Sequence, residues 1–318
     1  MKPNIVVLDG GLANPGDLDW GSIARQGQLT VYDQTRPEQI VDRTRNADIV
    51  IVNKVRLGPG QFNSLPELKL ICLLATGYDN IDIAAARQRG IVVCNAVGYA
   101  VSSVAQHVFA LVLSVYNRVY EHNASIQKGE WSNREWSYSL TPLRSLEQKT
   151  MGIYGFGKIG KKVAAIAQSF DMTVIAHHSH PERDATEKVE FVSLEELFRR
   201  SDIVTLHAPL STSNEKVVNS ILLQLMKPGA MLVNTGRGGL INEDQLRSYL
   251  IDHPGNMAVL DVLSQEPPSK NHPLLGLENC IITPHNAWAS RTARASLIKI
   301  VSRNISSFLS GAPTNVVH

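Results

Sequence analysis

Three polar side chains in the C-terminal half of the chain, Arg237, Glu266 and His285, have types and positions suited to acid–base chemistry. Arg237 lies between glycines after an apolar run, and its planar fork of donors suits a carboxylate and a neighbouring carbonyl. The imidazole of His285 follows a rigid Thr-Pro turn and exchanges protons near neutral pH. Glu266 could bond the other ring nitrogen, orient the ring and favour its protonated form. A solvated arginine and a structural histidine are the alternatives, but all three at strand ends favour catalysis.

A glycine-rich stretch near the midpoint predicts a dinucleotide site. Gly155, Gly157 and Gly160 fit the G-x-G-x-x-G pattern, between an apolar strand and a helix expected over residues 158–170. Gly155 permits a tight turn, Gly157 lets the backbone approach a pyrophosphate, and Gly160 lets helix and strand pack closely. The free N–H groups of the helix N-terminus favour phosphate. A turn without a ligand is the alternative, and the strand at residues 172–176 argues against it.

The first hundred residues alternate short apolar runs with helical stretches such as residues 36–45 and 83–89. Such alternation predicts βαβ units and a parallel sheet, here a small flavodoxin-like domain without a phosphate loop of its own. The expected strands are residues 4–9, 29–32, 49–52, 70–74 and 91–94.

A hinge is expected at residues 95–100, followed by a long helix over residues 102–120 whose middle is apolar on nearly every side. A helix of that kind is buried between domains or subunits. The loop at residues 129–146 is rich in aromatic residues and is expected to pack against something. Further strands are expected at residues 172–176, 202–206, 230–234, 257–261 and 280–283, and further helices at 194–200, 219–226 and 243–250.

The pattern as a whole predicts an α/β fold with two doubly wound parallel-sheet domains. A Rossmann cofactor domain at residues 100–288 would be inserted into a flavodoxin-like substrate domain. The substrate domain would comprise residues 1–99 and, through a returning helix, residues 289–318.

The composition is that of an ordinary globular chain: 318 residues, 43% hydrophobic and 19% charged, with a net charge of +2. This balance offers no electrostatic reason to expect nucleic acid or a membrane as a partner. The apolar run near the N-terminus ends at Asp9, so no signal peptide is expected. Cys72, Cys94 and Cys280 are widely spaced in apolar runs, which predicts buried thiols, a cytoplasmic location and no metal site.

The chain resembles the D-isomer-specific 2-hydroxyacid dehydrogenases over essentially its whole length. Within that family, VNKVRL (52–57), GEWS (129–132) and HNAW (285–288) look most like the glycerate dehydrogenase, or hydroxypyruvate reductase, branch. The family resemblance is carried by ATGYDNID (75–82), SVAQH (103–107), GFGKIG (155–160), MKPG (226–229), NTGRG (234–238), LDV (260–262) with EP (266–267), and TPH (283–285).

The resemblance implies a role for each candidate catalytic residue. Arg237 would bind a 2-oxo acid and polarise its carbonyl, His285 would protonate the oxygen as hydride arrives, and Glu266 would hold His285 protonated. The physical logic is consistent, because negative charge builds on an oxygen at which one cation and one acid are aimed. Backbone N–H groups around Thr76 and Gly77 would bind the carboxylate, and Lys54 and Trp288 would be weaker candidates as pocket walls.

The same resemblance implies the cofactor contacts. Asp261 would face the nicotinamide carboxamide. The other expected contacts are Gly155, Phe156, Gly157, Lys158, Ile159, Gly160, His178, Ser179, His207, Ala208, Pro209 and Thr235.

One position departs from the NAD-specific pattern, which has an acidic residue after the second strand to hold the ribose hydroxyls. That position here is His178, and Ser179, His180 or Arg183 could bind a 2′-phosphate. We therefore expect either NAD or NADP as cofactor, with NADPH accepted or preferred.

The expected function is reversible reduction of a small 2-oxo acid, of the hydroxypyruvate or glyoxylate class, to the D-2-hydroxy acid with NAD(P)H. The alternatives are a dehydrogenase for a sugar acid or another 2-hydroxy acid, and a dinucleotide-sensing binding protein like the corepressors that share this fold. The long apolar helix and the aromatic loop predict a homodimer built on the cofactor domains.

Overall fold

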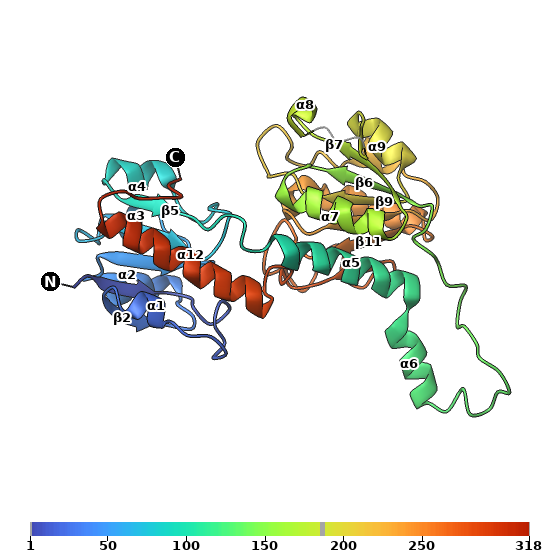
Figure 1. Cartoon of the computed structure of the whole chain (residues 1–318), viewed down its shortest axis with the longest axis horizontal. Helices are drawn as coiled ribbons and strands as arrows, with labels where there is room; N and C mark the ends of the chain where they lie inside the picture. The colour runs from blue at the N-terminus through green and yellow to red at the C-terminus, as the bar shows by residue number, and fades with distance from the viewer. Residues whose placement is uncertain (1, 185–187, 318) are drawn as a thin grey trace. The chain divides into compact units, whose positions relative to one another are not determined.

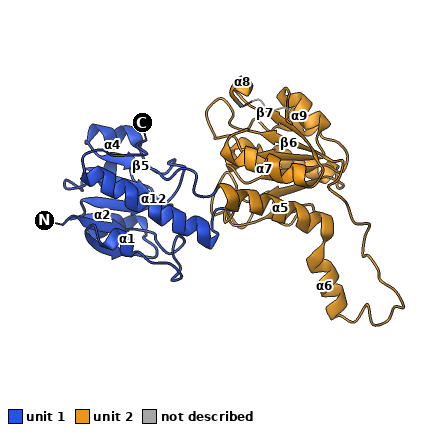
Figure 2. Ribbon diagram, viewed as in Figure 1, with its two compact units in different colours: residues 1–100, 288–318 blue, residues 101–287 orange. Residues whose placement is uncertain are grey.

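The computed structural model describes residues 2–184 and 188–317. The chain divides into two compact units, coloured separately in Figure 2. Unit 1 comprises Met1–Ala100 and Trp288–His318, and unit 2 comprises Val101–Ala287. Each unit is built around a parallel sheet, so the predicted α/β fold class with two parallel-sheet domains is confirmed.

The sheet of unit 1 has five parallel strands in the order β2-β1-β3-β4-β5, which is the flavodoxin-like doubly wound order. Its central strands β3 and β4 are wholly buried and consist of Ile, Val, Leu and Cys, because helices cover both of their faces. The strands are β1 (Asn4–Val7), β2 (Gln28–Val31), β3 (Ile49–Val52), β4 (Leu70–Leu73) and β5 (Val92–Cys94).

The helices of unit 1 cover two apolar cores. One core contains Leu297, Val301 and Ile305 of the long helix α12, and the other contains Phe62 and Ala86. The helices are α1 (Gly21–Ala24), η1 (Pro37–Gln39), α2 (Ile40–Thr44), α3 (Pro59–Phe62), α4 (Ile83–Gln88) and α12 (Arg291–Leu309), of which Figure 1 labels α1 to α4 and α12.

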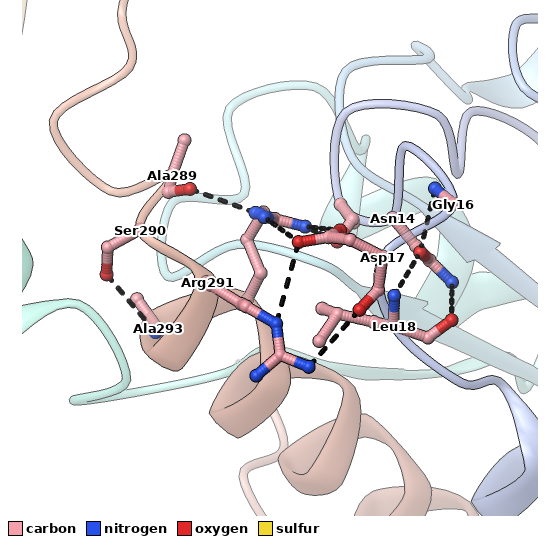
Figure 3. Close-up of polar contacts among 10 residues, drawn as sticks. Asn14, Gly16, Asp17, Leu18, Ala289, Ser290, Arg291 and Ala293 are labelled. Carbon is pink, nitrogen blue, oxygen red and sulfur yellow. Dashed lines mark hydrogen bonds and ion pairs between the residues drawn. The ribbon is translucent and has the colours of Figure 1, made fainter.

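The loop between β1 and α1 is tied to the start of α12 by charge pairs, although the two lie at opposite ends of the sequence (Figure 3). Both oxygens of Asp17 accept hydrogen bonds from the Arg294 guanidinium, at 2.7 and 2.8 Å, and Arg291 lies 3.8 Å away. The hydrogen bonds from Arg294 lower the pKa of Asp17 below its usual value. The contacts attach the first loop of unit 1 to the helix that returns to it.

The sheet of unit 2 has seven parallel strands in the order β12-β11-β10-β9-β6-β7-β8. The strand order reverses between β6 and β9, and ligands of doubly wound sheets bind at such a switch point. The strands are β6 (Thr150–Tyr154), β7 (Thr173–His177), β8 (Glu190–Phe191), β9 (Ile203–Leu206), β10 (Met231–Asn234), β11 (Met257–Leu260) and β12 (Cys280–Ile282).

Helices cover both faces of this sheet as well. The packed pair α5 and α7 contributes Val108, Val112 and Val163 to one core, and α9 and α11 contribute Leu197 and Leu246 to the other. The helices are α5 (Val101–Asn117), α6 (Val119–Gln127), α7 (Lys158–Ser169), α8 (Pro181–Asp184), α9 (Leu194–Arg200), α10 (Ser220–Leu223), η2 (Gly238–Leu240) and α11 (Glu243–Asp252).

The single helix predicted over residues 102–120 is wrong in extent. Arg118 adopts a left-handed conformation with φ of 47°, which ends α5, and α6 then leads away from the sheet (Figure 1). Apolar side chains of α6 and of the segment after it are exposed, with Tyr120 81% and Trp136 79% accessible.

In the described part of the chain, no helix is both long enough and apolar enough to cross a membrane.

Candidate active site

The glycine loop joins β6 to α7, and the structure gives each of its three glycines a distinct environment. Gly155 has a φ of +96°, and a Cβ there would lie 2.3 Å from the backbone nitrogen of Ala208. A Cβ on Gly160 would lie 2.3 Å from the carbonyl oxygen of Gly155. At Gly157 a Cβ would meet nothing within 4 Å, so this position leaves room beside the N-terminus of α7. Two glycines therefore serve packing, and the third faces open space.

Two buried polar atoms at the ends of the neighbouring strands fit a bound dinucleotide. Nδ1 of His207, after β9, and Oγ1 of Thr235, after β10, have no hydrogen-bond partner among the described residues. The Nε2 atom of His207 meets Oγ1 of Thr205 at 2.9 Å. Burial lowers the pKa of His207 to about 3, so its ring is neutral near pH 7. Unpaired buried polar atoms are costly, and the polar groups of a nucleotide would satisfy them.

The turn that carries Arg237 is shaped by the fully buried Asn234 at the end of β10. The side-chain oxygen of Asn234 accepts from the Gly236 N–H at 3.0 Å, and its amide donates to the Arg237 carbonyl at 2.9 Å. The guanidinium Nη1 donates to the Gly236 carbonyl at 2.9 Å. The end of a buried strand thus orients this cation.

Glu266 and His285 form a hydrogen-bonded pair in the structure. Nδ1 of His285 lies 2.6 Å from Oε2 of Glu266, and the two side chains are 24% and 30% exposed. His285 has a φ of 52°, and its N–H donates to the Thr283 carbonyl at 3.0 Å. Because Nδ1 is engaged by the carboxylate, Nε2 is the atom of His285 suited to exchanging a proton with a substrate.

The Arg237 turn and the Glu266 loop pack backbone against backbone at Gly238. A Cβ on Gly238 would lie 1.9 Å from the carbonyl carbon of Leu263 and 2.3 Å from the nitrogen of Ser264. The Leu263 N–H in turn donates to Oε1 of Glu266 at 3.2 Å. The structure therefore joins the turn of Arg237 to the loop of Glu266, and the absence of a side chain at position 238 permits this contact.

Asp261 lies beneath the loop that carries His285. Its carboxylate accepts hydrogen bonds from Oγ1 of Thr283 at 2.6 Å and from the N–H groups of Asn286 and Ala287 at 3.0 and 2.9 Å. Burial alone would raise the pKa of Asp261, but the hydrogen bonds from His107, Thr283 and the backbone outweigh it and lower that pKa. The predicted contact of Asp261 with the cofactor stays a prediction, and its observed contacts hold the His285 loop.

Helix α5 supplies two further contacts to this loop that sequence reasoning did not assign. Oγ of Ser103 donates to the Ala287 carbonyl at 2.7 Å, and Nε2 of His107 lies 3.1 Å from Oγ1 of Thr283. Residues four apart share one face of a helix. The available signal was a histidine and a serine at that spacing in a largely apolar helix.

Lys54 and Trp288, predicted as substrate contacts, lie in unit 1 in different settings. The backbone of residues 53–55 is held by Asp9, which accepts N–H groups at 2.6 Å from Asn53 and 2.9 Å from Val55. Lys54 is exposed on this loop. Trp288 is only 8% exposed and packs edge-to-face on Tyr99, so it belongs to the core of unit 1.

Thr76 and Gly77 follow β4. The Thr76 hydroxyl donates to the Ala96 carbonyl at 2.7 Å, and the Thr76 carbonyl accepts from the Asn95 side chain at 2.7 Å. These bonds fix the turn and leave its N–H groups as the predicted carboxylate contacts.

The predicted ribose-binding segment follows β7. His178 is half-buried, and its Nε2 lies 3.2 Å from Nη2 of Arg183. The exposed His180 and Glu182 lie 3.6 Å apart, and Ser179 is exposed between the two histidines. The structure thus gathers a guanidinium and imidazoles at the position where an NAD-specific fold has a carboxylate.

Comparison with known proteins settles the family. The model of the D-isomer specific 2-hydroxyacid dehydrogenase NAD binding domain matches residues 109–287. A hydroxypyruvate reductase of Blautia hydrogenotrophica is 40% identical over 99% of this chain and 99% of its own. The chain belongs to the D-isomer-specific 2-hydroxyacid dehydrogenases.

Other known proteins are similar over nearly the whole chain. A glycerate dehydrogenase of Methylorubrum extorquens is 37% identical over 90% of each chain. An acyclic imino acid reductase, solved with NADPH and D-Arg, has a TM-score of 0.86 and 32% identity over 99% of this chain and 100% of its own. The expected family is confirmed, and this family member is an oxidoreductase of CH–OH donors with an NAD(P)-binding domain.

Proposed function

We propose that this dehydrogenase reduces a small 2-oxo acid of the hydroxypyruvate or glyoxylate class to the D-2-hydroxy acid with NAD(P)H, reversibly. The observation that carries the proposal is the Glu266–His285 pair at 2.6 Å, in which the loop of Glu266 packs against the turn of Arg237. An acid–base pair, with a cation on the adjoining turn, suits protonation of an oxygen that gains negative charge. The names of the two curated relatives support the substrate class.

Each residue then has a defined task. The Arg237 guanidinium binds the carboxylate and polarises the carbonyl of the substrate, and Nε2 of His285 delivers the proton to its oxygen. Glu266 stabilises the imidazolium and keeps the ring oriented. Bound NAD(P)H supplies the hydride. The N–H groups of Thr76 and Gly77 are the proposed contacts of the substrate carboxylate, and Lys54 is a weaker candidate.

We also propose that unit 2 is the cofactor domain and unit 1 the substrate domain. The open space at Gly157 and the unpaired atoms of His207 and Thr235 support the first assignment. The proposed contacts along the dinucleotide are Gly155, Phe156, Gly157, Lys158, Ile159, Gly160, His178, Ser179, His207, Ala208, Pro209, Thr235 and Asp261.

A substrate panel tests the proposal. We expect oxidation of NADH or NADPH with hydroxypyruvate or glyoxylate at a kcat/KM well above that with pyruvate or 2-ketogluconate, measured by the loss of absorbance of the reduced cofactor. Faster turnover of 2-ketogluconate would favour the sugar-acid alternative. Cofactor binding without turnover of any 2-oxo acid would favour the dinucleotide-sensing alternative.

We expect NADPH to be accepted or preferred, because Arg183 and the histidines can pair with a 2′-phosphate and His178 stands where an NAD-specific fold has an acidic residue. The Arg183→Ala variant should raise the KM for NADPH about tenfold, as expected for a lost charge-assisted bond. His178→Asp should improve NADH relative to NADPH. Steady-state kinetics with both cofactors checks this, and a KM for NADH a hundredfold below that for NADPH would contradict it.

We propose a homodimer formed through unit 2. The exposed Tyr120, Trp131 and Trp136 on α6 and the segment after it support the proposal. Light scattering should give about twice the 34.9 kDa chain mass. A monomer over the working concentration range would end this proposal.

A cytoplasmic location is proposed as well. Cys72 and Cys94 are buried and Cys280 is half-buried, and none of the three forms a disulfide. Unpaired thiols of this kind are typical of a reducing compartment.

A further inference from the structure

A second acid–histidine pair, Glu243 and His272, lies behind the loop that carries Glu266. Glu243 is the first residue of α11, and the two side chains are only 11% and 6% exposed. Nε2 of His272 lies 3.3 Å from Oε2 of Glu243, and Nδ1 of His272 accepts the Leu274 N–H at 3.4 Å. Together these contacts select the tautomer in which Nε2–H donates to the carboxylate. A charge this well buried is uncommon unless it is bonded.

The Glu243 carboxylate holds Ser264, two residues before Glu266. Oε1 accepts the Ser264 backbone N–H at 2.7 Å, and Oε2 accepts the Ser264 hydroxyl. The preceding residue, Leu263, donates its N–H to Glu266. Glu243 therefore binds the N–H of the peptide unit between residues 263 and 264, and the N–H of Leu263 just before it binds Glu266. The same peptide unit packs on Gly238.

The loop is anchored in the apolar core at Leu263, and beyond that residue it lies at the surface. Residues 264–268 are all exposed, so hydrogen bonds rather than apolar burial determine where Glu266 stands. A displacement of about 1 Å lengthens a hydrogen bond enough to lose much of its energy, and errors of this size in an active site cost roughly 10²-fold in rate.

We propose that Glu243, supported by His272, is a positioning residue for the Glu266–His285 pair. The proposal rests on the proposed function, because it takes that pair as the proton-transfer machinery. Glu243 fixes the peptide before Glu266, and Glu266 in turn fixes the orientation and charge of the His285 ring.

Charged and titratable groups from several elements lie near His285 and Glu243, in addition to the Arg237 turn that packs on the Glu266 loop. His285 is faced by Glu266, by Asp261 beneath its loop and, through Thr283, by His107 of α5. Glu243 is faced by His272 and by Cys280. Burial, together with the charge of Glu243, raises the pKa of the Cys280 thiol to about 12, so the thiol stays neutral. A change at Glu243 can reach His285 as lost charge or as lost geometry, and Glu243→Asp, which keeps the charge, tests the geometry by itself.

Glu243→Asp keeps the charge and shortens the reach, whereas Glu243→Gln keeps the length and removes the charge. Both should lower kcat for reduction about tenfold while leaving the KM for NADPH within about twofold. The alkaline limb of the kcat/KM profile should move to lower pH by about half a unit or more, because His285 loses its proton earlier. Asp244→Asn, an exposed carboxylate in the same first turn of α11, is the matched control and should match wild type.

The titration of the His285 ring by NMR, assigned with His285→Asn, gives a readout that does not need turnover. Its midpoint should fall in both Glu243 variants. If Glu243→Asp kept the wild-type alkaline limb of kcat/KM and the wild-type titration midpoint of His285, the proposal would be overturned. An equal shift of these two quantities in Asp244→Asn would overturn it as well. An enzyme that reduced no 2-oxo acid would refute the proposed function alone, since the NMR titration still decides the positioning role.

Ser264→Ala provides the test if the Glu243 variants fail to fold. It removes the hydroxyl and leaves the backbone bond to Glu243, so a smaller shift in the same direction is expected. A wild-type profile and midpoint in a folded Ser264→Ala, with unfolded Glu243 variants, would assign Glu243 to stability and overturn the proposal.

Discussion

His285→Ala and Arg237→Ala should each lose at least about 10²-fold in kcat/KM for reduction of the 2-oxo acid. The first removes the acid that protonates the developing alkoxide, and the second removes the cation that binds the carboxylate and polarises the carbonyl. The structure supports both losses, because each residue sits on a fixed turn, Arg237 on the Asn234 turn and His285 on the loop bonded to Asp261. Steady-state kinetics with the best 2-oxo acid of the panel measures the effect.

A backbone effect must be separated from the chemical one at position 285. The φ of 52° there is left-handed, and asparagine tolerates that conformation better than alanine. His285→Asn should therefore lose as much activity as His285→Ala while unfolding at a temperature closer to wild type. NAD(P)H binding, followed by fluorescence, should be retained in all three variants. Near-normal turnover in either His285→Asn or Arg237→Ala would refute the assignment of that residue.

Gly238→Ala should be nearly as damaging as loss of a catalytic residue, although position 238 carries no reactive group. The new Cβ would stand 1.9 Å from the Leu263 carbonyl carbon and 2.2 Å from its oxygen, and both are backbone atoms that cannot rotate away. The Arg237 turn and the Glu266 loop must then separate. We expect a loss of roughly 10²-fold in kcat/KM from the misplaced loops and about 1–3 kcal/mol in the free energy of unfolding from overpacking.

The adjacent glycine provides the control. A Cβ on Gly239 would meet only the end of the Leu210 side chain, at 2.8 Å, and that side chain is able to move. Gly239→Ala should therefore keep kcat/KM within about threefold of wild type and lose less stability, because the contact can relax. Denaturant unfolding and kinetics on both variants check the pair. Equal damage at the two positions would show that the close approach of the two loops is not the cause.

The elements with strong local patterns were predictable. Strands of continuous apolar residues such as β3 are recognisable as buried parallel strands. The spacing of the glycines fixed where the loop ends and the following helix begins. The prediction of a single helix across Arg118 was wrong, because a left-handed residue can break a helix without interrupting its pattern of apolar residues. The strand β8 was missed because its two residues are too short to show periodicity.

The sequence by itself determined which residue types stand at the ends of which strands. Strand ends of a parallel sheet gather at one edge, so Arg237, Glu266 and His285 could be expected together before any coordinates. The sequence also predicted that His178 replaces the acidic residue of NAD-specific folds, because the position follows from counting along one strand.

Only the tertiary structure decided how these residues are held. Hydrogen bonds between segments far apart in sequence have no local signature, so the support of the His285 loop by Asp261 and His107 was not readable from the chain. The contact of Gly238 with Leu263 is likewise a matter of interatomic distance, which depends on how two loops pack. Sequence patterns report the propensity of each segment, whereas the placement of a catalytic group depends on contacts that form only when the segments come together.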